Sequence, residues 1–528
     1  MTAAPDDQSA APGQSSRRVS HWDVVKSHSL ITDEILSHVY EGSGTAVDPF
    51  LVNFPPNDPR NPMNFSTPKK WFITSVVTAS VFAVTLTSSA YSGSSKEITR
   101  DFGISSELAA AGISLFVLGF AVGPCLWAPL SELYGRQVLF VSTNALVVAF
   151  VAGAAGSRNV ASLLVFRFLG GTFGASPLTN AGGVIADIFP PSHRGLGMAL
   201  FSAAPFLGPL LGPIVAGFIS MNVGWRWVQG TMAILIGVIW IAGSLTIPET
   251  YAPVLLRRRA KRLSKQTGKC YISLLERDRR DADISALLAR VLKRPWQLLF
   301  REPIVLVASV YMAILYGTLY MLFGAFPIVY QQQRGWSEGV GGLAFLGTTV
   351  GMVLGLSYVI VDNKRYRRLH DGPYKDTSPP PEARLPPAIV GAIALPVGMF
   401  WFAWTCTPEY HWAIGVAAGA PFGFGMVLVF LSCINYLVDA YTVYAASVLA
   451  AGAMLRAYFG AAFPLFTRVM YERLGVHWAS SIPGFLTLAC LPFPLLVYRH
   501  GESLRMRCKY AKEAALVMAQ LESSSDDQ

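Results

Sequence analysis

Residues 129–136 read PLSELYGR and separate two long apolar runs of the chain. Each run has about the 20 residues that a helix needs to cross a bilayer. Gly135 permits a tight turn between them, because glycine adopts backbone conformations that other residues avoid. Glu132 and Arg136 put opposite charges at the helix ends, where they can bridge neighbouring helices. The stretch therefore predicts two membrane helices that meet at a short turn, Leu108–Leu130 and Val138–Gly156.

The composition of the whole chain also indicates a membrane protein. Its 528 residues are 52% hydrophobic and only 14% charged, against about 25% charged residues in ordinary soluble chains. Six cysteines are too few for a disulfide-rich secreted scaffold. The high apolar content excludes a chain that is disordered throughout.

Twelve apolar runs are long enough to cross a membrane, and a long basic linker divides them into two groups of six. The first group is Trp71–Tyr91, Leu108–Leu130, Val138–Gly156, Ala161–Ile185, Leu196–Ile219 and Val228–Pro248. The second group is Pro303–Val329, Val340–Val361, Ala388–Cys406, Trp412–Val438, Ala445–Val469 and Ile482–Tyr498. We expect an all-α membrane protein with twelve transmembrane helices in two six-helix halves. Its expected parts are a polar N-terminal tail (1–70), a first bundle (71–248), a linker (249–302), a second bundle (303–498) and a C-terminal tail (499–528).

The distribution of positive charge gives the expected orientation. With a cytosolic N-terminus, most Lys and Arg residues fall in the inner loops, as the positive-inside rule requires. We therefore expect both termini in the cytosol. The expected location is the plasma membrane, and the vacuolar membrane is the alternative. The net charge of +10 comes largely from the linker, so it does not indicate nucleic-acid binding. The tail 1–70 is polar and is expected to be loose.

The second part of the linker, Asp278–Phe300, is amphipathic. Its apolar residues recur at helical spacing, with arginine and lysine around them. This pattern predicts an interfacial helix on the inner membrane surface, in contact with anionic lipids. The alternative is a solvated linker with some helix.

Several motifs resemble the major facilitator superfamily, and more closely its fungal drug:proton antiporter branch with twelve spans. They are Asp58-Pro59-x-Asn61-Pro62, Ser131-Glu132-x-x-Gly135-Arg136, Gly224-Trp225-Arg226-Trp227, Pro248-Glu249-Thr250-Tyr251 and Pro381-Glu382-x-Arg384-Leu385. The resemblance implies two halves that rock around a midplane site, a small-molecule substrate and coupling to protons. It implies no enzyme activity, cofactor or metal, and the protein is expected to be a monomer.

Arg167 lies in the fourth span, within Arg167-x-x-Gly170-Gly171-x-x-Gly174. This segment is similar to a family motif whose arginine is linked to proton coupling. An arginine inside a membrane is costly unless it is paired or faces water, so we expect it to face the bundle interior. A coupling role predicts that Arg167→Ala abolishes transport with membrane abundance intact. The alternative is a structural arginine that reaches a backbone carbonyl or the outer headgroups.

The fifth span carries a glycine and proline pattern that resembles the antiporter signature of drug exporters. Its members are Gly208, Pro209, Gly212, Pro213 and Gly217. Each proline removes a backbone donor and bends the helix, and the glycines form one smooth face. We expect this face to slide against a partner helix like a hinge, and static packing is the alternative.

Arg456 in the eleventh span is the second deep charge. It is expected either to meet the substrate or to support Asp439 and Glu472 nearer the helix ends. Acidic residues are missing at mid-membrane depth, where an exporter of cationic drugs would need one. We therefore expect neutral amphipathic or anionic substrates, such as secondary metabolites or small organic acids. Further cavity candidates, for which core packing is the alternative, are Tyr316, Tyr320, Asn435 and Tyr436.

Residues near the inner helix ends form the expected inner gate. In the first half they are Glu132, Gly135, Arg136, Asp187 and Arg194. In the second half they are Asp362 and Arg365. An acid followed by a base at the same loop position of both halves is what an internal duplication would leave.

Secondary active export of a small organic molecule is the favoured function, and polyspecific multidrug export is its first rival. A P-loop is missing from the sequence, which disfavours an ATP-driven pump. Eight scattered histidines do not suggest a membrane enzyme or a metal site. A non-transporting receptor or scaffold is the rival from another class.

Overall fold

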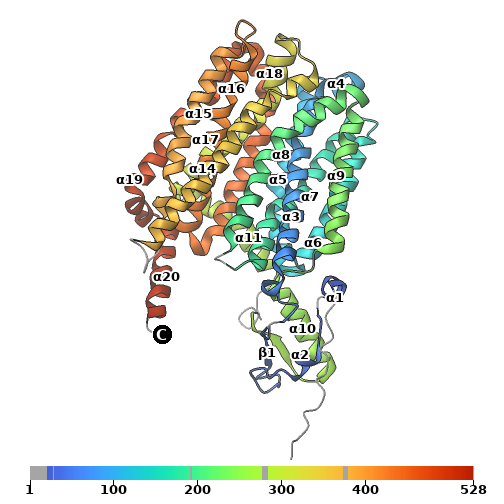
Figure 1. Cartoon of the computed structure of the whole chain (residues 1–528), viewed down its shortest axis with the longest axis vertical. Coiled ribbons are helices and arrows are strands. Elements are labelled where there is room, and N and C mark those ends of the chain that lie inside the picture. The colour runs from blue at the N-terminus through green and yellow to red at the C-terminus, as the bar shows by residue number, and fades with distance from the viewer. Residues whose placement is uncertain are drawn as a thin grey trace, which may run out of the picture.

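A tall bundle of long helices, with a small module of shorter elements below one end, makes up the computed structural model (Figure 1). We call the end of the bundle next to the module the proximal end, and the opposite end the distal end. The structure describes residues 21–27, 29–56, 58–190, 193–275, 284–372 and 379–526.

The first half of the bundle has the six expected spans. They are α3 (Thr67–Ala90), α5 (Ser106–Tyr134), α6 (Arg136–Ala155), α7 (Val160–Ile188), α8 (Arg194–Val223) and α9 (Trp225–Thr246). The turn η1 (Pro62–Asn64) precedes α3. At its distal end, α3 continues into a 3₁₀ turn, η2 (Tyr91–Ser94), and a short helix, α4 (Ser95–Phe102).

The second half contains six long helices as well. They are α12 (Pro303–Phe326), α14 (Phe345–Asp371), α15 (Pro386–Thr405), α17 (Gly419–Ala440), α18 (Ala445–Cys490) and α19 (Pro492–Arg507). Short elements extend or connect them: η4 (Pro327–Gln333), α13 (Glu338–Gly342), η5 (Pro381–Arg384), α16 (Trp412–Ala417) and η6 (Thr442–Tyr444).

A break inside α18 divides it into two membrane spans, which brings the expected number of spans to twelve. Gly475 has a left-handed φ of 71°, so 445–474 and 476–490 are separate helical stretches, and the second leads into α19. The described chain has 11 helices that are long and apolar enough to span a membrane, and the last of them runs across this break. The expected twelve helices in two six-helix halves are therefore confirmed.

The two halves touch through a small set of helices. Within the first half α5 packs on α7 and α3 on α8, while in the second half α12 packs on α18 and α15 on α17. Between the halves, α5 packs along α18, and α8 packs against α13 and α14. Residues of α5, α8, α13, α14 and α18 therefore form the contact between the halves.

Much of the described N-terminal tail folds onto the linker, so the expectation of a loose tail is wrong there. Strand β1 (Phe50–Val52) pairs in parallel with β2 (Tyr271–Ser273), beside α10 (Ala252–Thr267). A small apolar core joins the two segments through Ile35, Tyr40, Val52, Leu256, Ala260 and Leu263. Together with α1 (His21–Lys26) and α2 (Asp33–Ser37), we call this unit the proximal module. Residues 1–20 lie outside the described chain.

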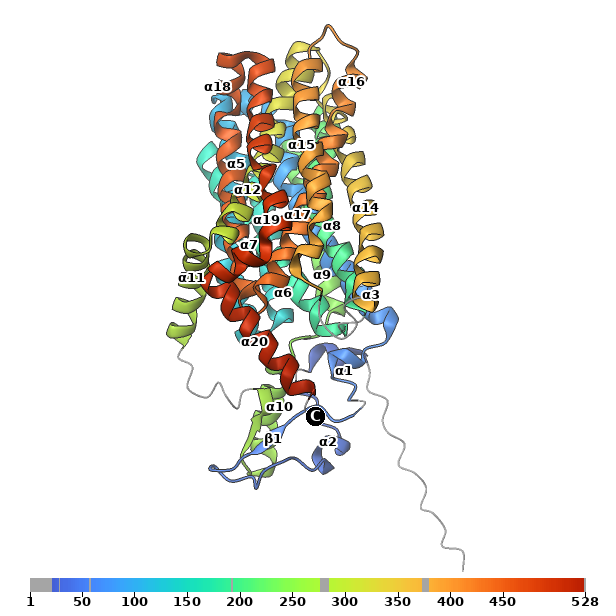
Figure 2. The same cartoon turned by 90° about the vertical axis from the view of Figure 1, so that its left-hand side faces the viewer.

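A helix forms in the amphipathic part of the linker, as expected. It is α11 (Ile284–Arg301), while residues 278–283 fall outside the described residues. The helix packs against α18, where the ring centroid of Trp296 lies 6.4 Å from that of Tyr458. Figure 2 shows α11 on the flank of the bundle near its proximal end, with the C-terminal helix α20 (Lys509–Asp526) below it.

Candidate functional site

Arg167 is enclosed within the first half, with 1% of its surface exposed. Its Nε donates to Gly112 O of α5 at 2.9 Å. Its Nη1 and Nη2 donate to Thr87 O and Ser88 O of α3 at 3.1 and 2.8 Å. Arg167 therefore ties α7 to both α3 and α5.

The local geometry of α3 explains why its carbonyls accept from a side chain. At Tyr91 the α-helix gives way to the 3₁₀ turn η2, and the last carbonyls of a helix lack partners within it. A cation also suits the negative end of the helix dipole. The rings of Tyr91 and Phe116 lie 4.8 and 4.3 Å from the Arg167 guanidinium carbon. Because all three nitrogens bind backbone carbonyls, the geometry favours the structural alternative for Arg167.

The two halves share a polar contact close to Arg167. The hydroxyls of Ser88 in α3 and Tyr320 in α12 lie 2.8 Å apart, and the Tyr316 hydroxyl donates to that of Tyr320 at 3.5 Å. Nearby rings from α8 and α17, Phe206 and Phe430, pack edge to face with centroids 5.2 Å apart. We call these five residues, together with Arg456, the central cluster.

Arg456 of α18 contributes the charge of the central cluster. Its guanidinium carbon lies 5.5 Å from the centroid of the Phe430 ring, and its Nη1 lies 3.9 Å from Met312 Sδ. Within the described chain, no carboxylate lies within 4.0 Å of it. Asp439 and Glu472, the acids that the sequence links with it, pair with other arginines. Arg456 therefore keeps most of its donors available for a ligand.

The two remaining cavity candidates lie on α17. Asn435 is exposed, whereas Tyr436 is buried and its hydroxyl has no hydrogen-bond partner in the described part of the chain. No hydrogen bond among the described residues joins either of them to the central cluster. The structure therefore brings Tyr316, Tyr320 and Arg456 together, but not these two.

The first two glycines of the α8 motif pack this helix on its own half. A Cβ atom on Gly208 would overlap the Thr85 hydroxyl of α3, and one on Gly212 would overlap the Ser89 hydroxyl. Only glycine at these two positions allows α8 and α3 to lie so close together. This contact favours the alternative that the motif serves static packing. The prolines of the motif lie inside α8, at Pro209 and Pro213.

The third glycine of the motif, Gly217, contacts the opposite half at the distal end. A Cβ atom there would lie 2.6 Å from Glu338 O and 3.0 Å from the Gly339 Cα of α13. Both neighbours are backbone atoms, which cannot turn away as a side chain can. Gly217 is therefore the member of the motif that limits how closely the two halves meet.

We expect Gly217→Ala to open the distal contact between α8 and α13. Overpacking of this kind costs about 1–3 kcal/mol, which shifts a two-state equilibrium about 5- to 150-fold. The measurement is the labelling rate of a Ser92→Cys variant by a membrane-impermeant maleimide, since Ser92 is buried in η2. Gly230→Ala is the control, because its Cβ would meet only Trp227 at 3.7 Å. Equal labelling of both variants would contradict the role of Gly217.

Glu249, just after α9, organises the proximal end of the first half. It is fully buried, and its carboxylate accepts from the backbone N–H groups of Arg136 at 2.9 Å and Gln137 at 3.2 Å. The N–H groups of Thr250 and Tyr251 donate to the same carboxylate, both at 2.9 Å. An acid at the first turn of α6 also suits the positive end of that helix dipole.

The loop before α6 contains two residues of the expected gate. Gly135 has a φ of 103°, and a Cβ atom there would overlap the Glu249 carboxylate. Glycine is therefore required for close approach as well as for the turn. Glu132 is exposed and forms no ion pair within the described residues. The expectation that Glu132 forms an ion pair with a neighbouring helix is therefore wrong for the described residues. The carboxylate that contacts the start of α6 is that of Glu249.

The other expected gate residues of the first half do lie at helix ends. Arg136 Nε is 3.4 Å from Asp187 Oδ2, which joins α6 to α7, and Arg136 also donates to the Ser131 hydroxyl. Arg194 does not join this pair. Its Nη2 donates to carbonyls at the end of α7, those of Ala186 at 2.9 Å and Phe189 at 3.3 Å.

The proximal module is fastened to this gate through buried arginines. Arg60 Nη1 donates to Glu249 O at 3.0 Å, and its Nε donates to Ser27 O at 3.1 Å. Burial lowers the pKa of Arg60 to about 10, so it stays protonated at neutral pH. Asp58 and Arg259 form an almost fully buried ion pair at 2.5 Å. The tail, the linker and the expected gate residues of the first half are therefore joined in one packed unit.

The second half also has an ion pair between two elements at its proximal end, and its acid and base are Asp439 and Arg384. Arg365 pairs with Asp362 on its own helix at 2.6 Å, and its Nη2 donates to Ala383 O of η5 at 2.9 Å, which joins α14 to η5. The corresponding pair is Arg384 with Asp439 at 2.9 Å, which joins η5 to α17 as Arg136 joins α6 to α7.

A second carboxylate of this half corresponds to Glu249. Glu382 accepts from Arg505 Nε and Nη2 at 2.8 and 3.2 Å, which connects η5, just before α15, with the last turn of α19. Glu249 and Glu382 both fall in segments that the sequence marks through the family resemblance. Their burial and partners depend on contacts more than 100 residues away, so the motifs alone did not indicate a gate role.

Comparisons with known proteins give one consistent result. The family model described as Major Facilitator Superfamily matches residues 77–464. The "MFS-type efflux pump MFS2" of Trichophyton rubrum is 58% identical, over 98% of this chain and 87% of its own. The "Major facilitator superfamily multidrug transporter mdrA" of Aspergillus fumigatus is 53% identical, over 99% of this chain and 86% of its own.

The fold is also similar to that of solved structures. The xylose transporter XylE from E. coli, in a partially occluded inward open conformation, matches with a TM-score of 0.57. The match covers 81% of this chain and 99% of that chain at 16% sequence identity. At this identity the likeness concerns the fold alone.

Proposed function

Since this chain belongs to the major facilitator superfamily and is a membrane transporter, we propose that it exports a small organic acid or secondary metabolite in exchange for protons. The proximal end faces the cytosol, and both termini lie there, because the linker carries an excess of positive charge. The substrate enters between the halves, and the halves alternate access to it. The plasma membrane is the proposed location, and the protein acts as a monomer.

Arg456 is the observation that carries the choice of substrate. It is an arginine at the interface of the halves without a carboxylate within 4.0 Å among the described residues, beside the hydroxyl groups of Tyr316 and Tyr320. A guanidinium in this setting binds carboxylate or enolate oxygens with charge-assisted hydrogen bonds. The aromatic rings of Phe206 and Phe430 supply apolar contact for the rest of an amphipathic molecule.

Proton exchange and contact with anionic lipids are two further parts of the proposal. Support for proton exchange comes from the resemblance to the drug:proton antiporter branch. Support for contact with anionic lipids of the inner leaflet comes from α11, whose Phe300 is 71% exposed and whose Lys293 is also exposed. A helix that combines exposed aromatic and basic side chains at this level suits a membrane surface.

Polyspecific drug export is the second candidate function. The aromatic side chains of the central cluster favour it, because rings bind apolar molecules with little selectivity for their shape. A relative that carries the name multidrug transporter also supports it. The two candidates differ in whether transport requires the charge of Arg456.

We expect Arg456→Gln to reduce export of an organic acid about tenfold or more, because it removes the cation and keeps the side-chain size. Folded abundance should not change, since Arg456 makes only weak contacts. The measurement is metabolite profiling of cells and medium from a deletion strain that expresses either the parent protein or the variant. The control is Arg473→Gln, an exposed arginine on the same helix element.

The profiles have distinct outcomes. One acid that is retained in the cells of the Arg456→Gln strain but lost from its medium supports the proposal. An acid exported equally by both strains contradicts it. Resistance to several unrelated toxicants that is unchanged in Arg456→Gln favours polyspecific export instead.

A further inference from the structure

A cavity of about 300 Å³ lies at the distal end, between the two halves and apart from the central cluster. We call it the distal cavity. Segments from both halves line it: η2, α4 and α5 from the first, and α12, η4, α13 and α18 from the second. Ligand sites of small molecules begin at about this volume and combine apolar walls with a few polar groups. The distal cavity has both, so it has the form of a site for one small molecule.

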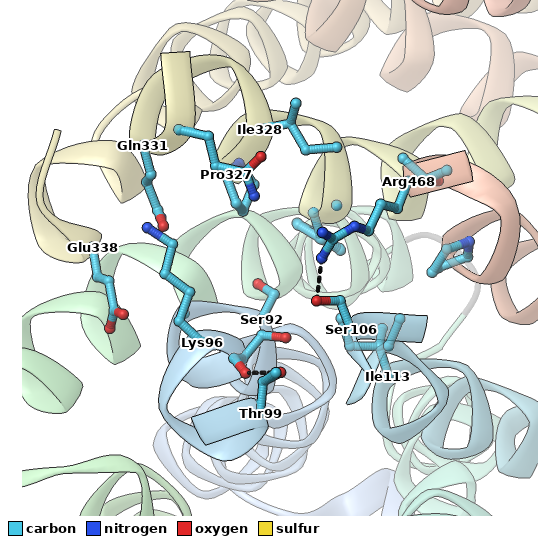
Figure 3. A pocket seen from close by; sticks show the side chains of 18 residues that line it. Ser92, Lys96, Thr99, Ser106, Ile113, Pro327, Ile328, Gln331, Glu338 and Arg468 are labelled. Carbon is cyan, nitrogen blue, oxygen red and sulfur yellow. Dashed lines mark hydrogen bonds between the residues drawn. The ribbon is translucent and has the colours of Figure 1, made fainter. Parts of the chain in front are cut away.

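One side of the distal cavity carries a cation that is available for a ligand. Figure 3 shows Lys96 reaching toward Gln331, on the same side as Glu338, with Arg468 across the cavity. Lys96 is exposed and has no ion pair within 4.0 Å in the described chain. Arg468 differs, because it pairs with Glu472 at 2.7 Å and donates to the Ser106 hydroxyl.

The carboxylate of Glu338 gives the cavity its second polar group. Its Oε2 is buried and has no hydrogen-bond partner among the described residues. A buried acceptor without a donor is costly, and a ligand hydroxyl can satisfy it. Glu338 and Lys96 both line the cavity, yet no ion pair joins them in the described chain, so a ligand can lie between their charged groups.

The apolar wall lies deeper in the cavity. Phe323, Ile113 and Pro464 contribute to it, from α12, α5 and α18. Phe323 packs edge to face on Tyr320 of the central cluster, with ring centroids 5.2 Å apart. A molecule that leaves the central cluster toward the distal end therefore passes the wall of the distal cavity next.

We infer that the distal cavity is a second binding site, which holds a hydroxylated organic acid before its release. The ligand carboxylate binds Lys96, its hydroxyl donates to Glu338 Oε2, and its apolar part packs on Phe323. This inference rests on the proposed function for the direction of transport and for the substrate class. It adds a position outside the central cluster and a requirement for a hydroxyl donor.

Three related probes test the site on the purified full-length protein in lipid nanodiscs. They are 4-hydroxybenzoate, which has both groups, benzoate, which lacks the hydroxyl, and 4-hydroxybenzyl alcohol, which lacks the carboxylate. We expect 4-hydroxybenzoate to have the lowest Kd in calorimetric titrations. Lys96→Met should raise that Kd about tenfold, as for the loss of a charge-assisted hydrogen bond. Glu338→Ala should remove the advantage of 4-hydroxybenzoate over benzoate.

Matched variants make the titrations decisive. Arg100→Met changes an exposed cation one turn further along α4 that does not line the cavity, and it should leave every Kd unchanged. Equal affinity of the parent protein and Lys96→Met for 4-hydroxybenzoate would overturn the inference. An equal effect of Arg100→Met would also overturn it, because general surface charge would then explain the binding.

The inference about the distal cavity and the proposed function are tested by different measurements, so either can be refuted without the other. Arg456→Gln should lose export while it keeps the binding of 4-hydroxybenzoate that depends on Lys96. If Arg456→Gln exports normally, the proposed substrate class falls, whereas the titrations still decide whether the cavity binds acids. If Arg456→Gln alone abolishes binding, the probe occupies the central cluster and the second site is refuted.

Discussion

Glu249→Ala is expected to remove most of the folded transporter from the membrane. Glu249 is fully buried and accepts from four backbone N–H groups, two at the start of α6 and two after α9. Each buried donor left without an acceptor costs about 1–3 kcal/mol. The combined loss of about 4 kcal/mol or more is a large part of the stability of an ordinary domain. The measurements are folded yield by fluorescence-detected gel filtration and the thermal midpoint of the purified protein.

Glu132→Ala is the matched control, because it removes an acid from the same proximal end. Glu132 is exposed and forms no ion pair within the part of the chain that the structure describes, so this variant should match the parent in yield and thermal midpoint. Glu249→Gln should be intermediate, since its amide oxygen still accepts while its NH₂ group faces an N–H donor. A low yield for Glu132→Ala together with a normal yield for Glu249→Ala would contradict the assignment of Glu249.

The twelve helices could be predicted because each is determined by its own sequence. An apolar run of sufficient length must form a helix in a bilayer to satisfy its backbone groups. The fold of the tail has a different origin. Strand β1 pairs residue by residue with β2, more than 200 residues later, and each strand has only three residues, too few to mark it in the sequence. Their pairing depends on a small apolar core that the tail shares with α10. The sequence of the tail alone therefore did not predict an ordered module.

From the sequence, the candidate site could be predicted only where the type of a residue, such as a charge at a helix end, indicated the role of that residue. Arg136 and Asp187 were expected at the same gate and do meet. The second half shows the limit of this reasoning, because Asp362 and Arg365 lie close in the sequence and pair along one helix. The pair that joins η5 to α17, Arg384 and Asp439, is separated in the sequence by α15, α16 and most of α17. Spacing along the chain therefore identified charged residues but not their partners.

Arg167→Ala is expected to lower folded abundance and transport together, which revises the expectation from the sequence of intact abundance. The variant removes three hydrogen bonds that tie α7 to α3 and α5. Hydrogen bonds between membrane helices are worth about 0.6–1.7 kcal/mol each, and the emptied space adds a cavity cost. A loss of about 3 kcal/mol follows. The measurements are folded yield, thermal midpoint and export per folded molecule.

Arg167→Lys separates the structural role from a role in proton coupling. Lysine keeps the positive charge, but its single nitrogen cannot reach three carbonyls on two helices as the planar guanidinium does. A structural role therefore predicts that Arg167→Lys also loses stability, while its remaining folded molecules transport at a rate close to that of the parent. Arg158→Ala, which changes an exposed arginine just before α7, should retain full yield. An Arg167→Ala protein that is stable and abundant but transports nothing would support the coupling role, because the three hydrogen bonds would then be dispensable for folding.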